Sequence, residues 1–302
     1  MHKRLFTSVS LIAFLSFAAT SCTDTAEDAA TESDDLSTID VNQDVVSAEN
    51  VFVYVPSPIE TAGLLKDAGA KYDPDLLSPP QNVSRYSTTA MQALNLGIYG
   101  TDLSFAGIFD QHAETMLYMD CTGKLADALH VSSAFSMDRS KRLEANMNNR
   151  DSVLNIITDT YWDCDALLHE NHQAHASALM IAGGWIEGLY LACKVAEETN
   201  SNEIRIRIAE QRSSLDKLIV LLDKQNHPDV VPVATELKKL KTIFDALPKP
   251  TQNSPVTTTD SKSGVTTIGD DSGIPTTSLN ALEFKNILNQ VSSIRNNIVN
   301  GN

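Results

Sequence analysis

The feature that most constrains this fold is residues 176–198, ASALMIAGGWIEGLYLACKVAEE, which are apolar on nearly every face of a helix. A helix that is apolar all round belongs in the middle of a protein or in a membrane. A membrane span is disfavoured, because Glu187 and Lys194 would be costly in lipid, so we expect a central helix. Small residues recur every fourth position and form a strip along which another helix can approach closely. The strip consists of Gly184, Gly188, Ala192 and Ala196, and we expect Gly183, which lies off it, to be less constrained.

A second ridge of small residues runs along residues 87–107, at steps of three and four: Ala90, Ala93, Gly97, Gly100, Ser104 and Gly107. Each interior glycine costs a helix about 0.5 to 1 kcal/mol relative to alanine, so two on one ridge indicate close packing. We predict that Gly97 and Gly100 face Gly184 and Gly188 across a helix crossing. The alternative is that Gly97 and Gly100 break the helix at a turn.

Polar residues form a separate stripe on each of these two helices, and the two stripes consist of Asn95, Tyr99, Asp102, Glu187 and Tyr190. One interpretation is a solvated face at the edge of the interface. The other is a polar pocket shared by the two helices, in which a carboxylate with a raised pKa would serve a hydrolase or a small-ligand receptor. Convergence of the side chains distinguishes these two interpretations.

The N-terminus predicts export. A basic start is followed by an apolar run too short to remain as a membrane helix, and by small residues suited to cleavage. Residues 19–22, Ala-Thr-Ser-Cys, resemble the lipobox of bacterial lipoproteins, which implies acylation of Cys22. Alanine stands at residue 19, where the lipobox usually has leucine, and an ordinary signal peptide is the alternative. Thr23 after the cysteine resembles the pattern that directs lipoproteins to the outer membrane. The sequence does not decide whether the protein lies on the periplasmic face or on the cell surface.

Residues 22–50 are acidic and contain no lysine or arginine, as expected of a flexible tether. Asp24-Thr25-Ala26 resembles the O-glycosylation motif of Bacteroidota, which would place a glycan on Thr25. The whole chain of 302 residues has a formal net charge of -16, which disfavours nucleic acid and anionic membrane surfaces as partners. The acylated cysteine is therefore the only membrane link that we expect.

The remaining periodicity predicts an all-α protein, a multi-helix bundle of antiparallel helices. We divide the chain into a signal peptide (residues 1–21), the tether (22–50), a helical domain (51–247), a Thr/Ser/Pro/Gly-rich segment (248–277) and a final amphipathic helix (278–302). The Thr-rich segment forms either a small β-hairpin or a disordered linker. The final helix has one apolar face, so it must dock on the rest of the protein.

The sequence indicates no catalytic residue, cofactor or metal site. His169, His172 and His175 are spaced by three, which drifts around a helix, so we interpret them as a solvated loop rather than a metal tract. Nucleophile, phosphate-binding and dinucleotide-binding motifs are absent from the sequence, which is mild evidence against an enzyme. We interpret the three other cysteines, Cys121, Cys164 and Cys193, as buried free thiols. The alternative is that two of them form a single disulfide.

Several segments resemble a group of predicted lipoproteins of Bacteroidota. The resemblance rests on VPSPIE, ALNLGIYGTDLSFA, WIEGLYLACKVA and AEQRSSLDKLIVLLD, and on the Thr-rich tail followed by IRNNIV. It implies an all-helical lipoprotein and brings no catalytic residues. We therefore expect a lipid-anchored protein of the cell envelope that acts as a binding or scaffold module for another envelope protein. The alternative is the receptor or hydrolase with the polar pocket, whose small-molecule ligand the sequence does not identify.

Overall fold

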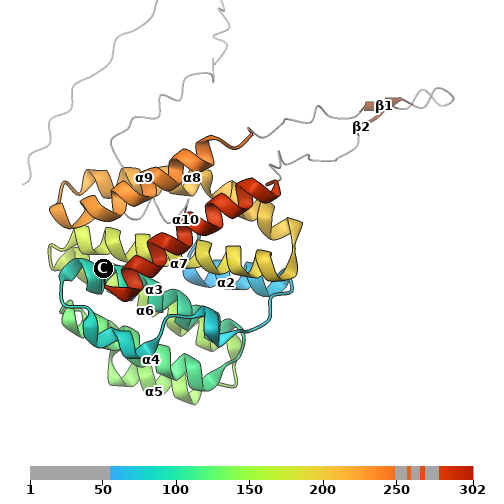
Figure 1. Cartoon of the computed structure of the whole chain (residues 1–302). Helices are drawn as coiled ribbons and strands as arrows, with labels where there is room; N and C mark the ends of the chain where they lie inside the picture. The colour runs from blue at the N-terminus through green and yellow to red at the C-terminus, as the bar shows by residue number, and fades with distance from the viewer. Residues whose placement is uncertain (1–54, 249–256, 260–265, 269–278, 302) are drawn as a thin grey trace, which may run out of the picture. The chain divides into compact units, whose positions relative to one another are not determined.

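The computed structural model describes residues 55–248, 257–259, 266–268 and 279–301, and within them the fold is an all-α multi-helix bundle, as predicted (Figure 1). The α-helices are α2 (Pro58–Asp67), α3 (Thr89–Ile108), α4 (His112–Ala128), α5 (Met137–Ala145), α6 (Arg150–Glu170), α7 (Ala174–Thr199), α8 (Asn202–Lys224), α9 (Val231–Asp245) and α10 (Ala281–Asn300). Short 3-10 turns join them: η1 (Pro74–Leu76), η2 (Pro80–Arg85), η3 (Ser132–Phe135) and η4 (Pro228–Val230). The predicted signal peptide and tether, with Cys22 and Thr25, lie outside the described residues.

Local sequence sets the helix starts. Ser57 accepts a hydrogen bond from the backbone N–H of Glu60, and the Glu60 carboxylate accepts one from the Ser57 backbone N–H at 2.7 Å. Asn280 and Glu283 form the same reciprocal capping box at the start of α10. Such caps satisfy backbone donors that have no partner inside the helix. They position α2 and α10, the first and last helices of the described chain.

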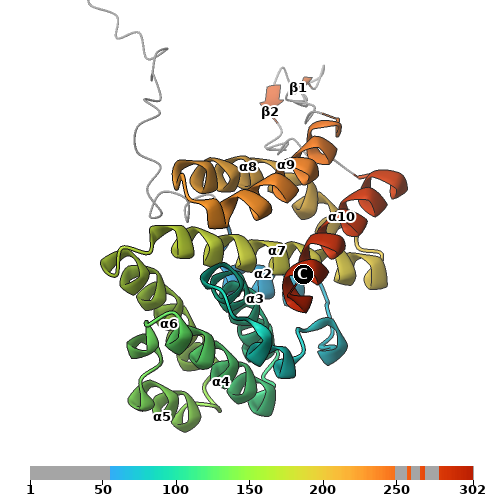
Figure 2. The same cartoon turned by 60° about the vertical axis from the view of Figure 1, so that its left-hand side comes forward.

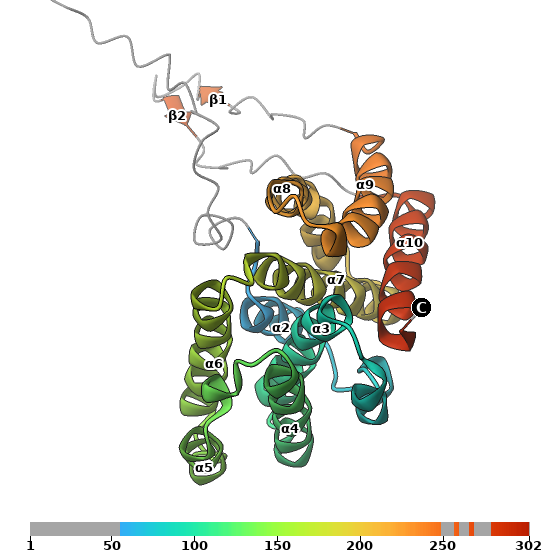
Figure 3. The same cartoon turned by 90° about the vertical axis from the view of Figure 1, so that its left-hand side faces the viewer.

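Helix α7 is the central helix, as its composition predicted. Residues 176–189 are all buried, so every face of these turns is covered by protein. Figures 2 and 3 show α7 running between the α8 and α9 pair on one side and α3 and α6 on the other. Within the described chain α7 is the helix long and apolar enough to cross a membrane, yet 89% of its apolar window is buried inside the bundle.

The Thr-rich segment contains two short strands, β1 (Thr257–Thr259) and β2 (Thr266–Ile268). They pair antiparallel, with Thr258 opposite Thr267. Of the two predicted alternatives for this segment, the described residues therefore have the hairpin.

Helices α3 and α7 pack closely, and glycine makes this contact feasible. Helix α3 is continuous through Gly97 and Gly100, so the predicted alternative of a break there is wrong. A Cβ atom on Gly97 would overlap the carbonyl oxygen of Met180 and lie 2.6 Å from the backbone nitrogen of Gly184. A Cβ atom on Gly183 would overlap the carbonyl oxygen of Leu94. Gly183 therefore lies at the closest approach of the two backbones, and the expectation that it is the less constrained glycine is wrong.

The prediction that Gly100 and Gly188 also face each other is wrong. The nearest atom to a Cβ on Gly100 belongs to Tyr161 of α6, at 3.9 Å, and the nearest to one on Gly188 belongs to Thr61 of α2, at 3.2 Å. Gly100 and Gly188 thus receive α6 and α2, whereas Gly184 still faces Gly97 and Thr101 of α3. Sequence spacing gave the strip but not the partner at each point along it.

Candidate functional site

The predicted polar residues are brought into one interior region. The side chains of Asn95, Tyr99 and Asp102 on α3 and of Glu187 on α7 are fully buried, and Tyr190 is half-buried. Charge interactions connect Asp102 with Glu187 across the two helices. The solvated-face interpretation is therefore wrong for these residues, and the stripe is an interior polar cluster.

Arg295 of α10 completes this cluster, and sequence reasoning missed it. Its Nε donates to Glu187 Oε2 at 2.9 Å and its Nη2 donates to Glu187 Oε1 at 3.1 Å, which makes a two-point ion pair. Nη2 also donates to Ser78 Oγ at 2.9 Å and to the Leu76 carbonyl at 3.2 Å. The guanidinium lies 4.6 Å from the centre of the Tyr190 ring, which adds a cation–π contact. A signal was available, because Arg295 lies four residues after the apolar Val291 on the docking face of the final helix.

Asp102 is the member of the cluster whose carboxyl group is only partly hydrogen-bonded. Its Oδ2 accepts a hydrogen bond from the Ser78 backbone N–H at 3.0 Å, while its buried Oδ1 has no hydrogen-bond partner among the described residues. Burial and the negative charge of Glu187 raise the pKa of Asp102 well above its usual value, and Arg295 and the Ser78 hydrogen bonds oppose the shift only in part. This carboxyl group therefore ionises less readily in the folded protein than it does in solvent.

The same region caps the C-terminal end of α10. The last carbonyls of a helix have no partners within it and need donors from elsewhere. Asn95 Nδ2 donates to the Ile298 carbonyl at 3.3 Å, and the Val299 carbonyl accepts from Asn82 Nδ2 at 3.1 Å and from Tyr86 Oη at 2.9 Å. These bonds and the Arg295 ion pair attach α10 to α3, α7 and the segment before α3. The polar cluster thus fixes the final helix, which confirms that this helix docks.

A scan against protein-family models and searches of curated proteins and of solved structures found no match.

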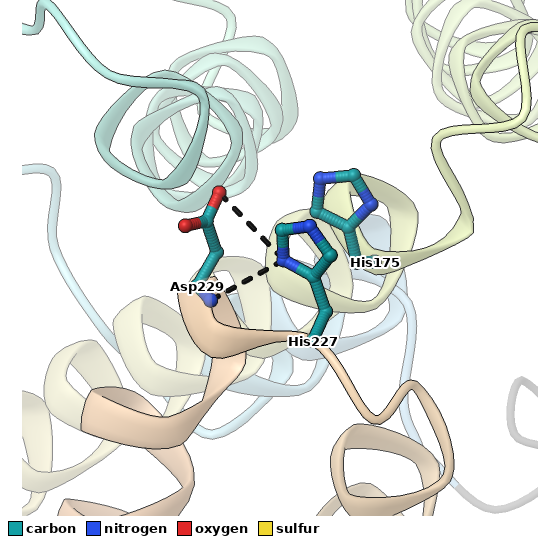
Figure 4. A group of neighbouring side chains, drawn as sticks. All are labelled: His175, His227 and Asp229. Atoms are coloured by element: carbon teal, nitrogen blue, oxygen red, sulfur yellow. Dashed lines mark hydrogen bonds and ion pairs between the residues drawn. The ribbon is translucent and has the colours of Figure 1, made fainter.

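The histidine tract that follows α6 is divided by the fold. His169 is at the end of α6, where its Nε2 lies 3.7 Å from Asp165 Oδ1. His172 is exposed in the loop. His175 is in the first turn of α7 and meets two residues from the turn between α8 and α9 instead: His227 and Asp229 (Figure 4).

The cluster of His175, His227 and Asp229 is half-buried, and each residue offers one metal-ligating atom within 4.8 Å of the others. The two imidazole rings stack with centroids 3.8 Å apart and an angle of 18° between their planes. His227 Nδ1 accepts a hydrogen bond from the Asp229 backbone N–H at 3.3 Å and lies 3.9 Å from Asp229 Oδ2. Burial, followed by the neighbouring His227, lowers the pKa of His175, while Asp229 opposes that shift. From the sequence, His175 is grouped only with His169 and His172, because no local spacing connects α7 with the α8–α9 turn.

The cysteines do not form the disulfide that was the predicted alternative. Cys121, Cys164 and Cys193 are buried free thiols. Burial raises the pKa of Cys121 to about 11 and also raises those of Cys164 and Cys193. Thiols that remain protonated in this way are small apolar groups of the core rather than nucleophiles.

An apolar groove lies on the side of α7 that faces α2 and α8. Its lining includes Leu64, Leu65, Trp185, Leu189, Ile204 and Ile208, together with the charged Glu203 and Arg207. Trp185 is fixed by a hydrogen bond from its Nε1 to Gln211 Oε1 at 3.1 Å, and Leu64 is 48% exposed. Pro56 also lines the groove, so the predicted tether joins the domain in sequence beside it. Trp185 is 5% exposed and the other aliphatic side chains named here are buried, so Leu64 supplies the exposed apolar surface of the groove.

Proposed function

We propose that this chain is an outer-membrane lipoprotein, anchored through an acylated Cys22, whose helical domain binds another envelope protein. The observation that carries the binding role is the apolar groove between α2, α7 and α8. The exposed Leu64 lies there beside buried apolar side chains that include Trp185, and apolar side chains of this kind are typical of the centres of protein interfaces. The charged Glu203 and Arg207 beside them would give the polar rim that surrounds such a centre.

The polar cluster supports the binding role over the receptor or hydrolase alternative. Glu187 is held at two points by Arg295, and both are buried. A hydrolytic or ligand-binding carboxylate must reach its substrate, whereas this pair joins α7 to α10 and to the segment that contains Leu76 and Ser78. The surface groove is therefore the better place to expect a function.

The partner that fits is a protein segment with apolar side chains, such as one face of an amphipathic helix, because a groove between helices accommodates that shape. The chain's formal net charge of -16 favours a partner whose flanking residues are basic or neutral. An anchor at Cys22 followed by an acidic tether would keep the domain near other envelope proteins, which raises its effective concentration toward them.

The groove is tested by photo-crosslinking in intact cells. A photoreactive residue placed at Leu64 in the groove is compared with one at Met137, which is 73% exposed on α5 and distant from the groove in sequence. We expect an adduct with an envelope protein from position 64 and none of that mass from position 137. Identical adducts from both positions, or an adduct from position 64 that contains this chain alone, would contradict the proposal.

The anchor is tested by Cys22→Ala. Loss of the thiol removes the acylation site, so the protein is expected to leave the outer-membrane fraction and to lose the crosslinked partner as the local concentration falls. Membrane association that persists unchanged in this variant would overturn the lipoprotein assignment while leaving the groove experiment valid.

A further inference from the structure

The cluster of His175, His227 and Asp229 lies apart from the groove, and it joins two segments that are distant in the chain. His175 is the second residue of α7, and His227 and Asp229 flank the first residue of η4, which leads directly into α9. His175 belongs to α7 itself, whereas His227 and Asp229 lie in the short turn between α8 and α9. Figure 4 shows the two rings side by side, with the carboxylate next to His227.

The three side chains are a coherent set of metal ligands. Two imidazoles and one carboxylate suit divalent transition metals such as Zn²⁺, whereas Mg²⁺ and Ca²⁺ prefer oxygen ligands. The Zn–N and Zn–O bond lengths of about 2.0 to 2.2 Å place tetrahedral ligand atoms roughly 3.3 Å apart. His227 Nδ1 and Asp229 Oδ2 are 3.9 Å apart, so only a small movement separates this pair from coordination distance.

The contacts that such a movement would break are weak. The hydrogen bond from the Asp229 N–H to His227 Nδ1 is 3.3 Å long, at the upper end of the normal range, and the stacked rings would need to tilt apart. All three side chains are half-buried rather than locked in the core, so their rotamers can adjust. An ion would replace a long hydrogen bond and a ring stack with three coordination bonds.

We propose that His175, His227 and Asp229 bind one divalent transition-metal ion, with Zn²⁺ as the type case. Three protein ligands leave at least one position of the ion for water or another ligand. Asp229 also lines a surface hollow together with Thr88, Met91 and Asn297, which gives that position access from solvent. The ion would fasten the first turn of α7 to the start of α9 and so stabilise the folded chain.

Zn²⁺ binding to the purified helical protein, produced without a polyhistidine tag, tests the site. Calorimetric titration with zinc chloride in excess Mg²⁺ is expected to show one ion per chain, and a melting experiment is expected to show a Tm higher by several °C. His175→Ala and His227→Asn should each weaken Zn²⁺ binding at least about tenfold and abolish most of the Tm rise. Asparagine at position 227 still caps η4, so that variant keeps the fold without the imidazole.

His172→Asn is the matched control, because it removes an exposed imidazole three residues from His175 and asparagine tolerates its positive φ of 59°. This variant should bind Zn²⁺ as the unaltered chain does. Binding that is lost equally in His172→Asn and His175→Ala would instead assign the ion to the exposed loop and overturn the proposal. So would the absence of saturable Zn²⁺ binding to the unaltered protein, or binding that His175→Ala and His227→Asn leave intact. Co²⁺ offers an independent readout, since its visible absorption should appear with the unaltered chain and disappear with His175→Ala.

Discussion

Helix α7 takes part in two polar clusters, one around Glu187 in its middle and one at His175 in its first turn. At Glu187 the opposite charge of Arg295 is bonded at two points and excluded from solvent. At His175 two rings and a carboxylate approach one another with long contacts and remain half-buried. In the first cluster the Glu187–Arg295 pair is closed on itself and holds the fold, although Asp102 Oδ1 has no hydrogen-bond partner among the described residues, whereas the second cluster has room for an added ligand. Burial and a two-point ion pair, rather than polarity alone, therefore distinguish the structural cluster from the candidate site.

Arg295→Met should produce the largest loss of stability. It leaves the Glu187 carboxylate buried without its partner, and breaking a buried ion pair in this way costs about 3 to 5 kcal/mol. Urea denaturation measures the loss. Lys285→Met, an exposed change on the same helix, should stay within about 0.5 kcal/mol.

The double variant Glu187→Met with Arg295→Met sharpens this test. Replacing both charges with apolar groups removes the unpaired carboxylate and should restore a large part of the stability. Ser78 and the Leu76 carbonyl still lose a donor, so recovery is expected to be incomplete. A loss below about 1 kcal/mol for Arg295→Met alone would show that the cluster does not hold α10.

Gly183→Ala comes next, because Gly183 lies between His175 and Glu187 on α7 and sets how closely α3 approaches. Its Cβ would overlap the Leu94 carbonyl oxygen, and the resulting shift of two backbones should cost about 1 to 3 kcal/mol or more. Gly63→Ala in α2 has no atom within 4 Å of its new Cβ and should instead stabilise the protein by about 0.5 to 1 kcal/mol. The two changes are chemically identical and differ in expected sign, so their denaturation midpoints decide whether the crossing is as tight as described. Equal midpoint shifts would refute the contact.

Asp102→Asn tests whether the raised pKa of Asp102 makes the stability of the protein depend on pH. The folded pKa of Asp102 is raised by burial and by Glu187, so the folded chain keeps a proton that the unfolded chain loses above about pH 4. Unfolding then releases a proton, and the contribution of Asp102 to stability falls as pH rises from the unfolded pKa toward the folded one. Asparagine removes this dependence while retaining an acceptor for the Ser78 N–H. The variant should gain stability relative to the unaltered chain as pH rises above about 4, by about 1.4 kcal/mol for each pH unit over which folded Asp102 keeps its proton. A stability difference that does not change with pH would contradict the shift.

The fold was largely predictable because its signals are local. Composition alone placed α7 at the centre, and the Ser57 and Glu60 capping box marked the start of α2. The polar stripes at Asp102 and Glu187 were predictable on each helix, since helical spacing fixes which residues share a face, but the sequence left their convergence open.

What the sequence did not predict depends on contacts between distant segments. Arg295 reaches Glu187 only because α10 docks across α3 and α7, and His227 meets His175 only because the α8–α9 turn returns to the first turn of α7. Gly97 and Gly183 became the tightest points because the backbone carbonyls of Met180 and Leu94 lie against them. Spacing fixes positions around one helix axis, whereas the height at which two helices meet depends on the packing of every other helix.

The smallest expected effect separates the two clusters most directly. Without added metal, His227→Asn should change the free energy of unfolding by less than about 0.5 kcal/mol, because asparagine can accept the Asp229 N–H as well as the imidazole does. His175→Ala should likewise stay within about 0.5 kcal/mol, since the half-buried ring loses a stacking contact and little else.

Urea denaturation in the presence of a chelator measures both variants beside Arg295→Met. A loss of about 2 kcal/mol or more from either histidine change would mean that this cluster, like the one at Glu187, exists to hold the fold. A near-zero loss combined with the loss of Zn²⁺ binding would leave ligand binding as the property that these side chains serve.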